Sequence, residues 1–287
     1  MRFAIESAPF HEVSLDSMGR EVAHLGFRYV NLWASARPLA AHVDVVQDDP
    51  RRVAQRLERW GLSAVGVTMY GKSQEEIAEG ISFAAALGAQ RVIFDCECNF
   101  PTFVDTFLPP LVHKAESQGV DICVENHLTV PFTYDFECGG HEQERWHEGV
   151  DTFAQIKRLV TEIDHPNLKI CLAPPHLWVV GESILEVATF RLERKKLGYY
   201  YVWDISRSYH RGADGLNFGP GQEQLPRVTG TLDHGFLLKV LAAAGYNGYA
   251  SLKCHGTADW SCEEVSRRLT QARNHVINVA GPGVFDQ

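Results

Sequence analysis

The sequence lacks the features that mark several large classes of protein. It contains no apolar run near the roughly 20 residues that a membrane-spanning helix needs, and its first residues, MRFAIESAPFHE, do not have the pattern of a secretory signal. The seven cysteines are odd in number and form no CxxC pair, which favours a reduced, cytoplasmic setting over a disulfide framework. A net charge of −9 disfavours nucleic acid. We therefore expect a soluble protein, with no membrane and no nucleic acid partner, that acts on a small molecule.

One pattern repeats along the chain of 287 residues. A segment with helical periodicity ends in glycine, and a short β-branched or aromatic run follows at once. Glycine suits the end of a helix because it adopts the left-handed conformation at no steric cost. The glycines in this position are Gly26, Gly61, Gly88, Gly119, Gly198 and Gly245.

Eight runs have the composition of strands. They are Phe3–Ile5, Tyr29–Trp33, Ala64–Thr68, Arg91–Phe94, Asp121–Val124, Lys169–Leu172, Tyr200–Trp203 and Tyr249–Leu252. Eight strands that alternate with helices predict an α/β fold, a single (β/α)8 TIM barrel over residues 1–287. A doubly wound open sheet is the rival fold, but no GxGxxG follows an early strand. The long connections 126–149 and 205–232 are expected to cover the mouth of the barrel.

The starts of several helices are equally readable. Asp49 is a predicted N-cap, because its side chain can accept from a free amide of the first turn. Ser73 with Glu76, and Ser261 with Glu264, have the spacing of capping boxes. These signals place helices between the expected strands.

The ends of the last four strands carry polar motifs, and in this type of barrel the chemistry sits where the strands end. The motifs are CVENH, LAPPHLWVVG, YYVWDISRS and GYNGYASLKCHG, in this order along the chain. These motifs, at the ends of the last four predicted strands, resemble those of the sugar phosphate isomerase/epimerase family, whose members have the xylose isomerase-like barrel. The resemblance covers nearly the whole chain.

The resemblance implies a divalent metal such as Mn²⁺ or Mg²⁺, held in the family by Glu, Asp, His and Glu at the ends of strands five to eight. This chain matches that set only in part. Glu125 matches the first ligand, whereas the other three fall on Ala173, Tyr201 and Lys253. A lone carboxylate cannot hold a divalent ion against water. The prediction is therefore no metal and no cofactor.

The family's chemistry is proton transfer next to a carbonyl, which leads to isomerisation, epimerisation or elimination. For this chain the resemblance implies a metal-independent enzyme acting on a small polyhydroxylated or sugar-like substrate. Glu125 is the expected base, Lys253 the electrophile and His176 a proton relay or a group that binds a substrate hydroxyl. Lys253 has two further readings, a fixed charge that pairs with Glu125 or a Schiff-base nucleophile.

A second group of residues is expected to bind the substrate. It comprises Arg207, which matches a substrate-binding arginine of the family, and Asp204, Tyr201, Trp33, Asp95, His127 and His255. Two alternatives stay open. The chain is a ligand-binding barrel without catalysis, or it holds a relocated divalent metal such as Mn²⁺ or Mg²⁺ through His127, His176 or His255. Related barrels often pair, so a homodimer is possible.

Overall fold

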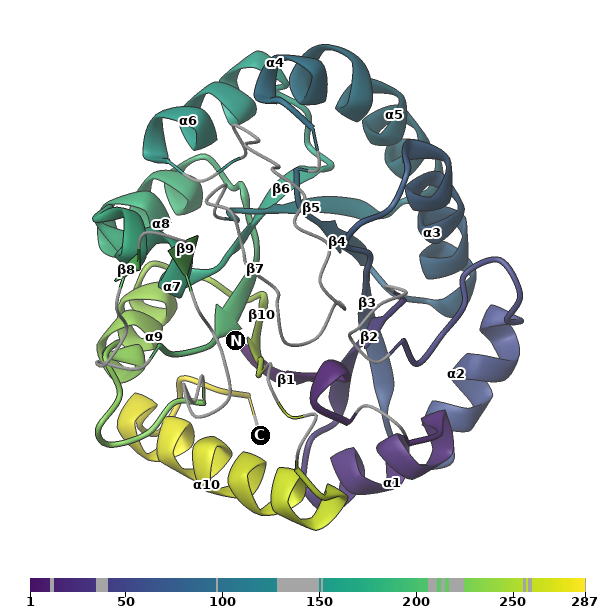
Figure 1. Cartoon of the computed structure of the whole chain (residues 1–287), viewed down its shortest axis with the longest axis vertical. Helices are drawn as coiled ribbons and strands as arrows, with labels where there is room; N and C mark the ends of the chain where they lie inside the picture. Colours follow the sequence, from purple (N-terminus) through teal and green to yellow (C-terminus); the bar gives the residue numbers. More distant parts are fainter. Residues whose placement is uncertain are drawn as a thin grey trace.

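Eight parallel strands close into a barrel in a computed structural model of the chain (Figure 1). The structure describes residues 1–10, 13–34, 41–96, 98–127, 150, 152–205, 211–212, 215–216, 225–254, 257 and 260–286. The barrel strands are β1 (Arg2–Glu6), β2 (Tyr29–Trp33), β3 (Ser63–Thr68), β4 (Arg91–Phe94), β5 (Asp121–Glu125), β6 (Leu168–Leu172), β7 (Leu197–Val202) and β10 (Tyr249–Leu252). Each strand pairs with the next in the sequence of barrel strands, and β10 closes on β1. The predicted TIM barrel is confirmed.

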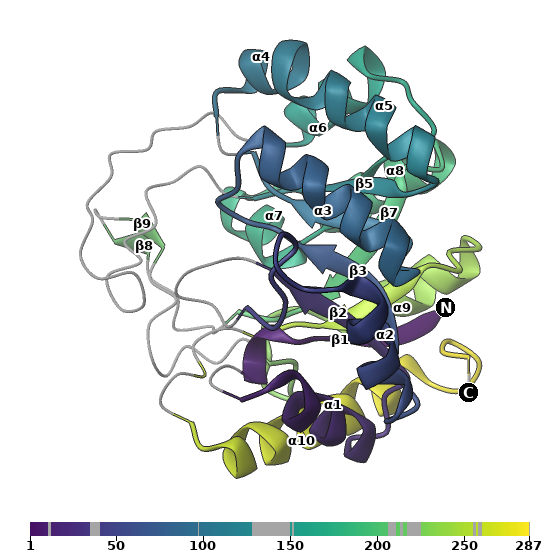
Figure 2. The ribbon, with the colours of Figure 1, turned by 90° about the vertical axis from the view of Figure 1, so that its right-hand side faces the viewer.

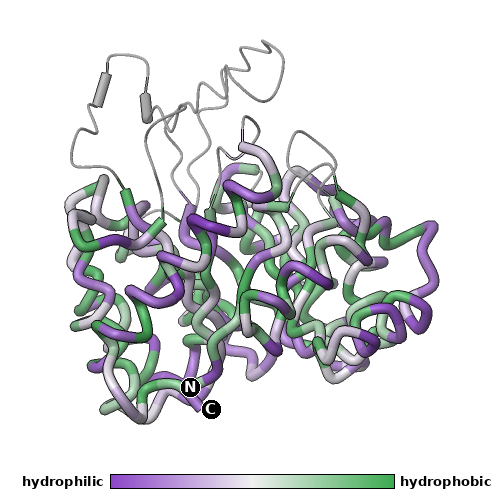
Figure 3. The backbone as a smooth tube through the Cα atoms, turned by 90° about the horizontal axis from the view of Figure 1, so that it is seen from below, coloured by the Kyte–Doolittle hydropathy of each residue, from purple (hydrophilic) through white to green (hydrophobic). Residues whose placement is uncertain are grey.

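Helices surround the barrel as a ring (Figure 1). The longer ones are α1 (Leu15–His24), α2 (Pro50–Glu58), α3 (Gln74–Leu87), α5 (Leu108–Gln118), α6 (Phe153–Glu162), α8 (Ile184–Glu193), α9 (His234–Ala243) and α10 (Cys262–Ala280). The shorter ones are η1 (Ala8–Phe10), α4 (Phe100–Thr102), η2 (Phe103–Phe107) and α7 (Pro174–Val180). A small antiparallel pair, β8 (Arg211–Gly212) and β9 (Gly215–Leu216), stands apart from the barrel. Along the outer helices, hydrophilic and hydrophobic residues alternate (Figure 3).

The predicted helix caps are present with one difference. The Asp49 side chain accepts from the first turn of α2, and Ser73 and Glu76 form a reciprocal capping box. Ser261 accepts from the Glu264 amide at 3.2 Å as predicted. The Glu264 carboxylate does not return to the cap; it pairs with the guanidinium groups of Arg267 and Arg268 at 2.7 and 2.5 Å. Cations one turn away outcompete the cap amide for this side chain.

Five of the six helix-ending glycines have positive φ as expected, namely Gly26, Gly61, Gly88, Gly119 and Gly245. The prediction for Gly198 is wrong. Lys195 takes the left-handed position with φ 56°, and β7 starts at Leu197, so Gly198 lies inside the strand. A Cβ on Gly198 would lie 2.6 Å from both Cys123 Sγ and Lys169 Cβ. This glycine is needed for close packing between strands.

The interior of the barrel is filled by side chains from the strands and from the residues that directly follow them, and many of these side chains are aromatic. This cluster consists of Ala4, Val65, Ile93, Cys123, Cys171, Ala173, Tyr199, Tyr201, Trp203 and Tyr249. Near the strand beginnings, the Arg91 guanidinium lies 4.7 Å from the centre of the Tyr249 ring and 5.5 Å from that of Tyr199. These groups fill that end of the barrel, so the polar site described below lies at the other end.

Both termini lie at the end of the barrel where the strands begin (Figure 2). The Met1 ammonium is 3.4 Å from the Asp286 carboxylate, which ties the two ends together. Within the described residues, no helix is both long enough and apolar enough to cross a membrane. Most of the two long connections, 128–149 and 206–210, 213–214 and 217–224, lies outside the described residues. Their expected role as covers of the mouth therefore stays a prediction.

Candidate active site

A buried ion pair lies at the C-terminal end of the strands. Glu125 is the last residue of β5, and Lys253 follows β10 directly. Strand alternation sends both side chains into the barrel, since Glu125 lies two residues after the inward-facing Cys123 and Lys253 two after Ser251. Lys253 Nζ donates to Glu125 Oε1 at 3.2 Å, and both side chains are almost fully buried. The two residues predicted to carry the chemistry are thus in direct contact.

The carboxylate of Glu125 is held in its charged form. Burial raises its pKa, but the Lys253 ammonium and the neighbouring His176 lower it more, so the net pKa is well below the usual range. An opposite charge at this distance in a buried site outweighs the loss of hydration. An isolated buried carboxylate would take up a proton; this one does not.

Four aromatic rings surround the ammonium of Lys253. Its Nζ lies 4.0 Å from the centre of the Tyr201 ring, 4.8 Å from Trp203, 5.2 Å from Tyr70 and 5.6 Å from Trp33. Ring faces attract a cation through their quadrupole, most strongly where water is excluded. The rings therefore compensate in part for the hydration that the buried ammonium has lost. We call these four residues the aromatic cage.

Tyr70, two residues after β3, is a site residue that the sequence analysis missed. Its hydroxyl donates to Glu125 Oε2, lies 3.0 Å from the Tyr201 hydroxyl and accepts from Lys253 Nζ at 3.3 Å. Burial and the charge of Glu125 raise the pKa of Tyr70 well above its usual value, so the phenol keeps its proton. No family motif falls on this position. The available signal was its place just beyond a strand end, in the sequence VTMYG.

His176 lies in the first turn of α7, directly after β6. Its Nε2 is 3.6 Å from Glu125 Oε1, and its ring contacts the rings of Trp203 and His127 at centroid distances of 4.9 and 4.4 Å. Burial and the nearby His127 lower the pKa of His176 to about 3, against the opposing effect of Glu125. The imidazole is therefore neutral at ordinary pH and has one unprotonated ring nitrogen.

Apart from Asp204, the predicted substrate-binding residues fall into three groups. Tyr201 and Trp33 belong to the aromatic cage, and His127 lies beside His176 with its Nδ1 4.0 Å from the Asp95 carboxylate. Arg207 and His255 lie outside the described residues.

Asp204 is placed differently from the others. Its Oδ1 accepts from the backbone amides of Ile205, Thr231 and Leu232 at 2.7, 3.0 and 3.1 Å. These bonds hold the segment that precedes α9 against the end of β7. The contacts thus give Asp204 a part in the wall of the site rather than a place beside the Glu125–Lys253 pair.

A second buried carboxylate, Glu6, lies at the end of β1 and was given no role by the sequence analysis. Oε1 accepts from Ser251 at 2.5 Å and Tyr199 at 2.9 Å, and Oε2 accepts from Asn31 at 2.6 Å and the Trp33 indole at 2.7 Å. Burial raises the pKa of Glu6, while its hydrogen bonds oppose that change. Through the Trp33 indole, Glu6 orients one wall of the aromatic cage.

Comparison with known proteins agrees with this architecture. The family model described as xylose isomerase-like TIM barrel matches residues 20–271. A xylose isomerase domain containing protein from Salmonella typhimurium superposes with a TM-score of 0.71, at 16% identity over 96% of this chain and 97% of that one. A search of the curated proteins finds none that matches significantly.

Two further solved structures carry a named activity. A D-psicose 3-epimerase from Clostridium cellulolyticum H10, crystallised with D-tagatose, has a TM-score of 0.67 at 15% identity, covering 97% of this chain and 99% of that chain. The probable 3-DHS dehydratase involved in petrobactin synthesis from Bacillus anthracis has a TM-score of 0.65 at 16% identity, covering 94% and 97%. At such identities the likeness concerns the fold.

Proposed function

We propose that this chain, which belongs to the xylose isomerase-like TIM barrel family, is an enzyme that transfers a proton next to a carbonyl group of a small, sugar-like substrate. The structural neighbours that carry a named activity include an epimerase and a probable dehydratase. Isomerisation, epimerisation and elimination can each begin with removal of a proton beside a carbonyl. The observation that carries the proposal is the buried Glu125–Lys253 pair, joined by the Tyr70 hydroxyl.

In the proposed reaction Lys253 and Tyr70 bind the substrate carbonyl, and Glu125 is the base. The substrate carbonyl oxygen accepts from the Lys253 ammonium and the Tyr70 hydroxyl, which takes these donors away from Glu125. Loss of those contacts raises the pKa of Glu125, so the carboxylate becomes a competent base only when substrate is bound. Glu125 then removes a proton from the adjacent carbon. The C–H electron pair forms the C=C bond of an enolate, and the negative charge on oxygen is stabilised by the ammonium.

The second half of the reaction returns the proton. The enolate takes a proton at the other face or the neighbouring carbon, or it expels a leaving group. Neutral His176, 3.6 Å from Glu125, is placed to carry the proton between these positions. Lys253 acts in this scheme as a fixed charge, because an ammonium held by a carboxylate is a donor and not a nucleophile.

The site does not fit the divalent metal of the family, which supports a metal-independent reaction. The Ala173 side chain has no donor atom, and the pKa of Tyr201 is raised well above its usual value by burial, so its phenol stays protonated. An ammonium already lies 3.2 Å from the one remaining carboxylate. Like charges at about 4 Å repel by roughly 4 kcal/mol at an effective dielectric of 20, so a cation would have to displace Lys253.

Solvent exchange tests the proposal whichever product the enzyme forms. A panel of ketoses, aldoses and keto acids is incubated with the protein in D₂O, and deuterium at the carbon next to the carbonyl is followed by NMR. We expect exchange that persists in EDTA and falls by about 10²–10⁴-fold in Glu125→Gln, the usual size of a general-base contribution. Glu75→Gln, an exposed position on α3, is the matched control.

Two outcomes would contradict this mechanism. Exchange that is lost in EDTA and restored by Mn²⁺ supports a relocated metal. A ligand that binds equally well to the native chain and to Glu125→Gln, with no exchange in either, supports a binding protein. The Glu125 carboxylate already has Lys253, Tyr70 and His176 as neighbours. A carboxylate that keeps these partners is a weak base, and this is the feature that favours a binding protein.

A further inference from the structure

A compact group of three metal-ligating side chains lies at the barrel end opposite the candidate active site. His113 and Glu116 stand on the second half of α5, just before β5 begins, and His165 lies in the connection that leads to β6. In a parallel barrel these positions, before the strands start, are at the far end from the mouth. None of the three takes part in the chemistry proposed above.

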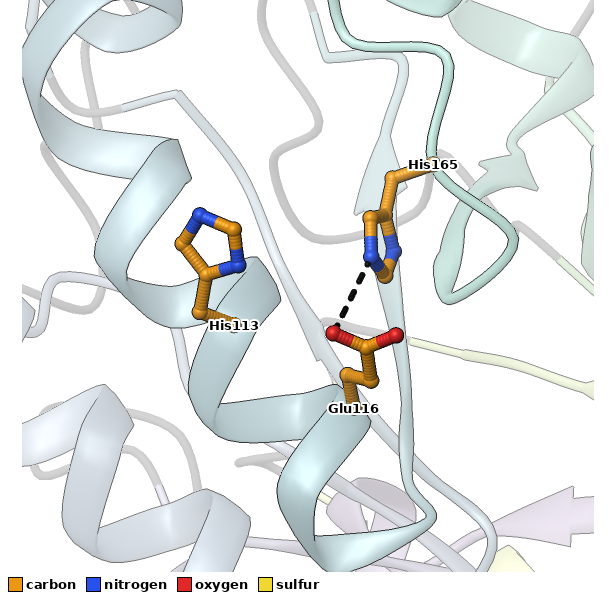
Figure 4. Close-up of side chains that lie close together, drawn as sticks. All are labelled: His113, Glu116 and His165. Atoms are coloured by element: carbon orange, nitrogen blue, oxygen red, sulfur yellow. Dashed lines mark ion pairs between the residues drawn. The ribbon is translucent and has the colours of Figure 1, made fainter.

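The three side chains converge, as Figure 4 shows. One ligand atom from each lies within 4.8 Å of the other two. His165 Nε2 is 3.5 Å from Glu116 Oε2, and the rings of His113 and His165 have centroids 6.2 Å apart. Residues three apart on a helix face the same side, which explains why His113 and Glu116 can approach one ion together. Ligands of a shared tetrahedral ion lie somewhat closer than this, so a small side-chain movement would close the site.

The backbone that carries His165 is held in place by other contacts. The His165 carbonyl accepts from Lys196 Nζ at 2.7 Å, and that ammonium also lies 3.1 Å from Asp164. The Asn167 side chain donates to the Val120 carbonyl at 3.0 Å, which links this connection to the start of β5. A fixed backbone reduces the conformational entropy that is lost when an ion orders its ligands.

The donor set selects the kind of ion. Two imidazoles and one carboxylate are the ligands of three-residue zinc sites, in which water takes the fourth position. Mg²⁺ and Ca²⁺ prefer all-oxygen sites, so they are poor occupants. The carboxylate of Glu116 neutralises one of the two charges of the ion. We propose that His113, Glu116 and His165 form a Zn²⁺ site that joins α5 to the connection before β6.

Binding has one identifiable cost. The backbone amide of Asn167 donates to His165 Nδ1 at 3.2 Å. In the neutral ring the proton therefore lies on Nε2, the nitrogen that faces Glu116. Zinc at Nε2 requires that proton to move to Nδ1, and the Asn167 hydrogen bond is then lost. The site is therefore expected to bind zinc more weakly than one whose histidines are oriented by acceptors.

The test is a zinc titration of the full chain after removal of metal with a chelator. Isothermal calorimetry and thermal unfolding are recorded with ZnCl₂, with MgCl₂ as the comparison, and Co²⁺ is added as a spectroscopic probe of four-coordinate geometry. We expect one Zn²⁺ per chain to bind here and to raise the unfolding temperature by mass action. In His113→Gln the affinity should fall by at least about 100-fold, because loss of an outer partner alone costs roughly 10–100-fold.

His24→Gln, an exposed histidine at the end of α1, is the matched control and should bind zinc as the native chain does. Glu116→Gln, on the exposed face of α5, should lose zinc binding as His113→Gln does. Equal zinc affinity in His113→Gln and the native chain would show that zinc binds elsewhere and overturn the assignment. Absence of binding in the native chain at about 100 μM zinc, where a micromolar site is nearly saturated, would overturn it as well. Neither result bears on proton exchange at the mouth, which reports on the other end of the barrel.

Discussion

Glu6 and Glu125 lie in the same barrel, each at the end of a strand and each with no exposed surface, yet they differ in their partners. Glu6 accepts hydrogen bonds from neutral groups, and its pKa is raised because burial dominates. Glu125 faces the Lys253 ammonium, and although burial raises its pKa, that charge and His176 bring the net value below the usual range. Burial alone therefore does not decide the state of a buried carboxylate; the charge of its partner does.

The two carboxylates also contribute to stability with opposite dependence on pH. The lowered pKa of Glu125 gives stability that is present above the unfolded value of 4.5 and is lost as the pH falls through the folded value. The raised pKa of Glu6 gives stability that is present below 4.5 and is lost as the pH rises through its folded value. Substitution of one residue in each region, followed by unfolding at several pH values, therefore separates the contribution of Glu125 from that of Glu6.

Removal of the cation should have the largest effect. Lys253→Met keeps the apolar stem but leaves Glu125 buried without its counter-charge. Breaking a buried pair in this way typically costs about 3–5 kcal/mol, and we expect the free energy of unfolding to fall by that amount. Urea denaturation measures it, and proton exchange should collapse in the same variant.

The double variant Lys253→Met with Glu125→Gln separates charge from packing. Because it removes both charges, it should recover much of the stability that Lys253→Met loses. If Lys253→Met is as stable as the native chain, the buried pair does not hold Glu125 in the way described.

At the Glu125 site acid should have the next largest effect, because protonation of His176 alone removes about 3 kcal/mol of stability between pH 6.5 and 4. Burial lowers the pKa of His176 to about 3 and that of His234, beneath Trp203, to about 4. Between pH 6.5 and about 4 the unfolded chain binds these protons and the native chain does not, so stability is full above pH 6.5 and falls as the pH is lowered. Each ring contributes a slope of about 1.4 kcal/mol per pH unit.

Unfolding curves of the native chain and of His176→Gln at several pH values check this slope. The variant should lose stability less steeply by about the contribution of one ring. An unchanged slope in His176→Gln would mean that His176 is already protonated in the native chain or is hydrated there.

Glu6→Gln should cost less than Lys253→Met, because no cation is left without a partner. The amide keeps one acceptor oxygen, but its NH₂ group meets two of the four donors, from Asn31 and Trp33 or from Tyr199 and Ser251. Each buried donor left without an acceptor costs about 1–3 kcal/mol. The Tyr199 and Ser251 hydroxyls can rotate to accept from the amide, so we expect the free energy of unfolding to fall by about 2–3 kcal/mol. Denaturation with urea measures the loss; a larger effect than that of Lys253→Met would reverse the comparison.

Tyr70→Phe should have the smallest effect on stability, about 1.5 kcal/mol, the lower end for a hydrogen bond to a charged group, because Glu125 and Lys253 keep each other as partners. The ring stays in the aromatic cage, and only the hydroxyl that joins Glu125 to Lys253 is removed. Tyr246→Phe is the matched control, since it removes a buried hydroxyl bonded to the Tyr249 carbonyl at 2.9 Å near the other end of β10. Proton exchange should fall in Tyr70→Phe and persist in Tyr246→Phe; equal exchange in both would remove Tyr70 from the mechanism.

Much of the fold follows from local sequence signals. Positive φ at glycines such as Gly88, the Asp49 cap and the capping box of Ser73 with Glu76 depend on a few neighbouring residues, so the sequence is sufficient to predict them. The order of strands and helices then determines a barrel, because parallel strands joined by helices have few ways to bury both faces. Glu125 and Lys253 could be assigned to the mouth for the same reason, since each directly follows a predicted strand.

Only the tertiary structure decided which side chains meet across the barrel. Tyr70 bonds Glu125, 55 positions further along the chain, and Glu6 collects donors up to 245 positions away, contacts that no local pattern encodes. Gly198 has a helix-ending sequence context, yet packing against Cys123 and Lys169 places it inside a strand. Local propensities are worth less than about 1 kcal/mol at most positions, whereas a clash or an unpaired buried charge costs several. Where the two conflict, packing determines the result.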